Sequence, residues 1–173
     1  MRRFFILLTL AIAIIATGHA QSLYGKYTSK LADEGTCHFI HGVKLKKLDN
    51  IKGFQYDMAC QSWTDSTTIN MSIFSLFDDT PKEVSLSIGG HEYLCSALEI
   101  FYIEKNKKNT HCRISVTMPN DVVHEFMKSE TPPIFNFKIG DTRATATYSA
   151  SSWKKDSKKL RRILEMINLS RKR

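Results

Sequence analysis

The stretch G-F-Q-Y-D-M-A-C-Q-S, residues 53–62, decides the fold class of this chain. Its apolar side chains recur at every second position, whereas most of the residues between them are polar. Period-two alternation is typical of a β-strand with one buried and one solvated face. The same alternation returns over residues 67–77, after the turn signal Thr64-Asp65-Ser66. The two stretches therefore predict a pair of antiparallel strands.

Further alternating segments follow, separated by turn signals such as Asp78-Asp79-Thr80-Pro81 and Gly89-Gly90. They lie at residues 84–88, 92–104, 112–118, 134–139 and 142–149. Residues 22–50 are mostly polar, and Val43, Leu45 and Leu48 could form either a short strand or a short helix. Between residues 119 and 129, the apolar residues are spaced as on a short helix, for which Asn120 or Asp121 is a plausible N-cap. The pattern predicts a mainly β fold, an antiparallel β-sandwich or partly open barrel of about seven strands with a short connecting helix.

A C-terminal amphipathic α-helix is predicted over about residues 154–169. Leu160, Ile163, Leu164 and Ile167 fall on one face at helical spacing, and Ser152 or Asp156 is a plausible cap. Basic residues occupy its flanks and back: Lys154, Lys155, Lys158, Lys159, Arg161 and Arg162.

The basic character of the chain belongs almost entirely to this tail. The formal net charge is +8, but residues 21–153 contain 14 Lys and Arg against 15 Asp and Glu, whereas residues 154–173 contain nine against two. Two interpretations stay open: the apolar face packs on the sheet with the lysines solvated, or these basic residues contact an anionic membrane surface or another polyanion such as lipopolysaccharide. Nucleic acid is disfavoured as a partner, because no aromatic residue follows Trp153 to stack on bases.

The first twenty residues have the pattern of a cleaved export signal. Arg2 and Arg3 precede an apolar run from Phe4 to Ala16, and Gly18-His19-Ala20 offers small residues for signal peptidase. The run is short for a membrane span. The sequence therefore predicts a signal peptide at 1–20, a single β-rich domain at 21–173, and a secreted or periplasmic location.

Four cysteines, Cys37, Cys60, Cys95 and Cys112, follow the predicted signal. In an oxidising compartment an even number most often forms disulfides. Three connectivities are open, and the sequence-local pairs Cys37–Cys60 and Cys95–Cys112 are preferred.

The segment T-C-H-F-I-H-G, residues 36–42, suggests alternative chemistry. Cys37, His38 and His41 could supply part of a metal site, with His91, Cys95, His111 or Cys112 completing it. However, neighbouring residues on a strand point to opposite faces, and His91 and Cys95 would lie about 13 Å apart along a strand. We therefore expect structural cysteines, no metal and no cofactor. A metal-dependent or histidine-based secreted hydrolase is the runner-up.

The order of the segments carries a resemblance. Quoted along the chain, they are Y-D-M-A-C at 56–60, T-T-I-N-M-S-I-F at 67–74, V-S-L-S-I-G-G at 84–90, Cys95, Cys112, and P-N-D-V-V-H-E-F-M-K-S at 119–129. Together with the final strand and helix, this order resembles small exported bacterial β-sandwich proteins of the invasion-associated-locus-B type and the periplasmic VasI-like proteins of type VI secretion. The resemblance covers roughly residues 54–167.

One departure from that pattern concerns tryptophan, which is expected before the first strand cysteine but here comes later, as Trp63. The basic C-terminal helix is not a feature of the resemblance. The resemblance implies a non-enzymatic exported β protein with host-, envelope- or secretion-linked roles, and it transfers no catalytic residue. The predicted function is binding of a protein or envelope component. The second alternative is an envelope-surface protein attached through its C-terminal helix.

Overall fold

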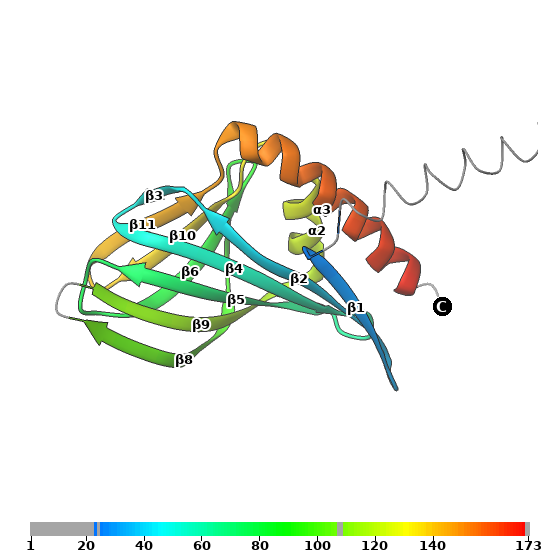
Figure 1. Cartoon of the computed structure of the whole chain (residues 1–173), viewed down its shortest axis with the longest axis horizontal. Helices are drawn as coiled ribbons and strands as arrows, with labels where there is room; N and C mark the ends of the chain where they lie inside the picture. The colour runs from blue at the N-terminus through cyan, green and yellow to red at the C-terminus, as the bar shows by residue number, and fades with distance from the viewer. Residues whose placement is uncertain (1–22, 24, 107–108, 172–173) are drawn as a thin grey trace, which may run out of the picture.

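Two antiparallel sheets and two helices make up the computed structural model, which describes Leu23 and residues 25–106 and 109–171 (Figure 1). The predicted signal peptide lies outside the described residues. The first sheet has six strands in the order β1 (Tyr27–Ala32), β2 (Gly35–Leu45), β4 (Ile51–Gln61), β5 (Ser66–Ser75), β9 (Asn109–Pro119) and β8 (Ser96–Asn106). The second has five, in the order β3 (Lys47–Asp49), β11 (Thr142–Thr147), β10 (Ile134–Ile139), β6 (Pro81–Ile88) and β7 (His91–Leu94).

The mainly β prediction is confirmed, and the two sheets are not closed into a barrel. The described residues contain more strands than the seven predicted, because β1, β2 and β3 occupy the region that the sequence left undecided. The expected strand over residues 92–104 is in fact two strands. The backbone N–H of Cys95 donates to the carbonyl of Val84 at 2.9 Å, and the chain then leaves the five-stranded sheet and joins the six-stranded one.

The core fills the space between the sheets. Along β4 and β5 each second side chain is buried, which is the alternation seen in residues 53–62 and 67–75. An aromatic cluster occupies the centre, where Phe135 of β10 lies with its ring 5.0 Å from that of Tyr56. The buried hydroxyls of Tyr56 and Tyr148 bond to each other, and burial raises the pKa of both phenols.

Helix α2 (Asn120–Lys128) is the predicted short connecting helix. Its N-cap residue is Pro119, so neither predicted cap is right, and no side chain caps the helix. Asn120 is buried instead. Its amide group donates to the carbonyl of Thr64, and its side-chain oxygen accepts from Thr67 at 2.7 Å. This residue therefore ties the start of the helix to the six-stranded sheet.

Helix α3 (Ala150–Arg171) begins four residues before the predicted start and lies across one end of the sandwich, over α2 (Figure 1). Ser149 precedes it, and its hydroxyl oxygen accepts from the N–H of Ser152 at 3.2 Å, as an N-cap side chain does. Six side chains of its inner face are buried: Trp153, Ser157, Leu160, Ile163, Leu164 and Ile167. The apolar stripe of the helix therefore belongs to the core.

Candidate functional site

The six basic residues of α3 that the sequence identifies lie away from the buried stripe of the helix. Lys154, Lys155, Lys158, Arg161 and Arg162 are exposed, and Lys159 is half-buried. Some of these side chains contact the fold: Lys159 lies 3.7 Å from Asp156, and Arg161 donates to the carbonyl of Lys128 at 3.2 Å. Among the described residues, no helix is long and apolar enough to cross a membrane. Because the apolar stripe is buried, attachment to a membrane would depend on surface charge alone.

All four cysteines lie among the described residues, and all are free thiols. The strand register explains why Cys37 and Cys60 are not joined. Cys60 pairs across the sheet with His38, and both point into the core, so Cys37, the neighbour of His38, faces the other side.

The second preferred disulfide also does not fit the sheet. Ser96 is opposite Thr117, whereas Cys112 is opposite Ile103, so Cys95 and Cys112 are about six residues apart along the strands. That separation is about 20 Å, and a disulfide requires Cα atoms less than about 7 Å apart. The sequence-local pairing is therefore incompatible with this fold.

We predict four reactive thiols in the denatured protein and at most one that reacts rapidly in the native state. Burial raises the pKa of Cys60, and it raises the pKa of Cys95 to about 12 and that of Cys112 to about 11. These thiols are protonated at neutral pH and react slowly. Cys37 should react first. Titration with a chromogenic disulfide reagent, with and without denaturant, measures both numbers; fewer than four thiols in denaturant would reveal disulfides.

The T-C-H-F-I-H-G segment forms part of β2, and its histidines serve the fold. His38 is buried and lies between two hydroxyls: Tyr27 Oη is 2.7 Å from its Nδ1, and Ser170 Oγ is 2.8 Å from its Nε2. Because the Ser170 hydroxyl donates to the carbonyl of Ile167, its oxygen can accept from an Nε2–H group, which leaves Tyr27 to donate to Nδ1. A neutral His38 thus links β1 and the end of α3.

The structure does not bring the alternative metal ligands Cys37, His38 and His41 together. His38 points into the core, and His41 bonds to the hydroxyl of Thr28 at 3.0 Å. In the ranges that the structure describes, no group of three His, Cys, Asp or Glu side chains is placed to hold a metal ion. The described residues therefore give the metal-dependent form of the hydrolase alternative no cluster of metal ligands.

We expect the protein to lose stability as the pH falls below about 6.5, the ordinary pKa of histidine. Burial, and then the charge of Arg171, lower the pKa of His38 in the folded state. The unfolded chain therefore takes up this proton at a higher pH than the native protein, so acid favours unfolding until the folded pKa is passed.

His124, whose pKa is also lowered by burial and by Arg171, acts in the same direction. Urea unfolding between pH 7.5 and 5 measures the effect. The variant His38→Gln should show a shallower pH dependence than the control His91→Gln, which changes an exposed histidine of β7. Equal slopes for the two variants would contradict this role of His38.

The exposed apolar surface of the molecule is concentrated on β8. Ile100, Phe101, Tyr102 and Ile103 are consecutive, and each is between 41 % and 55 % exposed. Among the described strands, β8 is an edge that pairs with β9, and no described strand pairs with the backbone groups along its other side. A long, apolar, unpaired edge strand is unusual in a natural protein, because it invites pairing with another chain.

The packing of the two sheets explains the exposure of β8. Ile100 lies opposite Ile114, and Ile103 lies opposite Cys112, on the core side of the six-stranded sheet. Ile114 and Cys112 are fully buried, so the cover provided by the second sheet ends between β9 and β8. β7 ends at Leu94, and it pairs with β6 only from Ser85 to Ile88. The sandwich is therefore open on the side of β7 and β8, and β8 forms one margin of the molecule (Figure 1).

The opposite face of β8 also carries an aromatic group. Tyr102 packs edge-on against the ring of His111, and His111 stacks on Phe74 of β5 at 4.0 Å between ring centroids. Phe74 is 41 % exposed. The register shifts between Ile100 and Tyr102, which leaves Phe101 as the extra residue of a β-bulge. A strand added to β8 would therefore contact apolar side chains on both faces.

Acidic side chains lie beside this edge. Glu99 and Glu104 lie on the same side of β8 as Tyr102, because their partners Ser115 and His111 share the outer face of β9. Glu104 is 3.8 Å from His111. The edge surface, defined here as Ile100–Ile103 with Phe74, Glu99 and Glu104, is therefore apolar with two glutamates on its outer face; the next residue of β8, Lys105, is exposed as well.

The sequence predicted a strand at β8 but did not show that this strand lies at the edge of its sheet. Its run of Ile, Phe, Tyr and Ile has the composition of a buried strand, and only the pairing order reveals that it is an edge.

The chain was compared with protein families, with curated proteins and with solved structures. No family model, no curated protein and no solved structure matches the chain. The resemblance in segment order thus stays a prediction.

Proposed function

We propose that this chain is an exported, non-enzymatic binding protein of the bacterial envelope or secretome, and that it binds an extended segment of another protein along β8. The observation that carries the proposal is the unpaired edge of β8 with its four consecutive exposed apolar residues. Added strands gain main-chain hydrogen bonds from the edge and specificity from alternate side chains. The export signal predicted at residues 1–20 supports the location.

The two glutamates on the outer face of β8 indicate the chemistry of the partner. Glu99 and Glu104 flank the apolar residues, so a bound strand should alternate apolar and polar residues and carry Lys or Arg near its ends. A second copy fits less well. An antiparallel pair of β8 strands that sets Ile100 opposite Ile103 also sets Glu99 opposite Glu104, and like charges directly opposite each other are destabilising.

The chain's own described ends are also poor occupants. β1 forms the other edge of the six-stranded sheet, five strand spacings or about 24 Å from β8. Ser170, near the end of α3, contacts His38 of β2. Both ends of the described chain therefore lie on the far side of the sheet from β8.

Selection from a random twelve-residue peptide display library on the purified protein tests the proposal. Enriched peptides should alternate apolar and polar residues, carry basic residues and lack a central proline, which cannot complete a strand ladder. Sedimentation of the free protein should show a monomer. No enrichment, enrichment of helical or cysteine-looped peptides, or a stable dimer through β8 would each overturn it.

A further inference from the structure

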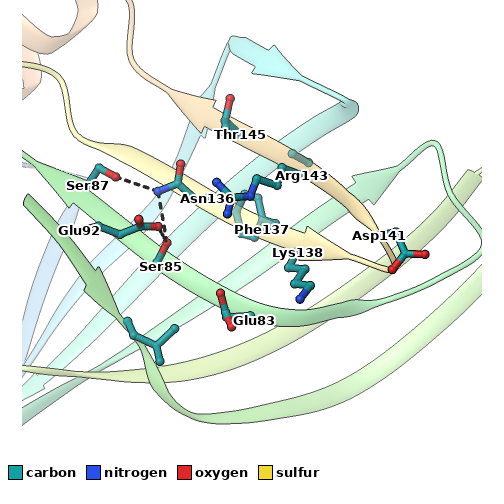
Figure 2. Close-up of a pocket in the computed structure, with 12 residues that line it drawn as sticks. Glu83, Ser85, Ser87, Glu92, Asn136, Phe137, Lys138, Asp141, Arg143 and Thr145 are labelled. Carbon is teal, nitrogen blue, oxygen red and sulfur yellow. Dashed lines mark hydrogen bonds between the residues drawn. The ribbon is translucent and has the colours of Figure 1, made fainter. Parts of the chain in front are cut away.

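A separate hollow lies on the outer face of the five-stranded sheet, facing away from the core (Figure 2). Its volume is about 630 Å³, and side chains from β6, β7, β10 and β11 line it. Cavities of a few hundred to about 1,000 Å³ are typical of small-ligand sites. The main-chain groups of its floor are bonded within the sheet, so a ligand here would be recognised by side chains.

Asn136 of β10 lies at the centre of a polar network in this groove. Its Nδ2 donates to the hydroxyl oxygen of Ser87 at 2.8 Å and, more weakly, to that of Ser85 at 3.3 Å. The Ser85 hydroxyl in turn donates to Glu92 of β7. These bonds orient the amide, and Figure 2 shows its oxygen turned away from both serines. The groove thus presents fixed acceptors, Asn136 Oδ1 and Glu92, beside the hydroxyl donor of Ser87.

Arg143 of β11 adds a positive charge to the network. It is exposed, and Figure 2 shows its side chain extending over β10 toward Asn136. In the part of the chain that is described, no carboxylate lies within 4 Å of its guanidinium group or of the Lys138 ammonium group. A guanidinium group binds a carboxylate through two parallel hydrogen bonds. Arg143 therefore offers an anion subsite beside Asn136, in a hollow whose lining also includes the carboxylates of Glu83 and Asp141.

We propose that this groove binds a saccharide that carries a carboxylate. Vicinal sugar hydroxyls donate and accept hydrogen bonds, and they match the amide, hydroxyl and carboxylate groups around Asn136. The sugar carboxylate would pair with Arg143. Phe137 has its side chain buried in the core, so recognition relies on hydrogen bonds rather than on an aromatic platform. The proposal is independent of β8, which belongs to the other sheet.

Calorimetric titration with digalacturonate, with the neutral digalactose and with sodium sulfate tests the site. We expect digalacturonate to bind at least tenfold more tightly than digalactose, and sulfate to compete only weakly. Arg143→Gln should remove the preference for the acidic sugar, whereas Asn136→Ala should weaken both sugars. The matched control is Lys44→Gln, which removes an exposed charge from the six-stranded sheet and should change nothing.

Melting curves for all three variants establish that each is folded. Three results would overturn the proposal. The first is that neither sugar binds at millimolar concentration. The second is that sulfate alone competes as well as digalacturonate, which would mark a simple anion site. The third is that Arg143→Gln and Asn136→Ala bind both sugars like the unchanged protein.

Discussion

Removal of residues 154–173 should leave a chain that does not fold. This deletion takes away Leu160, Ile163, Leu164 and Ile167, each no more than 4 % exposed against the core. Truncating one such side chain to Ala costs about 2–5 kcal/mol, and a domain of this size is stabilised by only about 5–15 kcal/mol in total. The loss of all four is therefore as large as the whole stability of such a domain.

A single substitution makes this expectation measurable. Leu164→Ala should lower the free energy of unfolding by about 2–4 kcal/mol, because Leu164 is 3 % exposed. Lys158→Ala, on the outer face of the same helix, should change it by about 0.5 kcal/mol or less. Urea unfolding measures both variants. A truncated chain that unfolds cooperatively, like the full chain, would show that α3 is an appendage rather than core.

The second large effect concerns the edge surface. Replacing Phe101 and Ile103 together by Asp should weaken binding of a selected strand peptide by about 100-fold or more. That factor corresponds to nearly 3 kcal/mol, within the range of interface hot spots. Both side chains are about half exposed in the free protein, so the double variant should retain its stability to within about 1 kcal/mol.

Leu31→Asp is the matched control for this experiment. Leu31 is 80 % exposed on β1, the opposite edge of the same sheet, so the change adds a similar charge at a similar exposed site. Fluorescence anisotropy with a labelled peptide measures the affinities. If Leu31→Asp weakens binding as much as the β8 double variant does, the peptide does not recognise β8.

The sequence predicts those elements of the fold in which burial follows a simple period. Residues 53–62 alternate because β4 packs one face on the core, and α3 shows its stripe because that face is covered. β1 gives no such signal, since nearly all of it is exposed and neither face has to be apolar. In β2 the pattern is misleading, because His38 is buried while Phe39 points outward.

The candidate sites were harder to predict because they depend on pairing between distant segments. The exposure of Ile100 and Ile103 follows from where β7 ends and where the second sheet stops covering the first. Likewise, the network of Asn136, Ser85, Ser87 and Glu92 forms only through the register of β10, β6 and β7, and Arg143 lies near Asn136 only because β11 pairs with β10. The disulfide preference was wrong for the same reason, since closeness in sequence does not give closeness across a sheet.

Hydrogen–deuterium exchange along β8, with and without a selected peptide, is the most direct measurement of strand addition. In the free protein, the β8 amides that are not bonded to β9 should exchange rapidly, because no strand covers them. With the peptide bound, we predict slower exchange from Glu99 to Glu104 and no change in β1. Protection that appears elsewhere, or β8 amides that are already fully protected in the dilute free protein, would contradict the account.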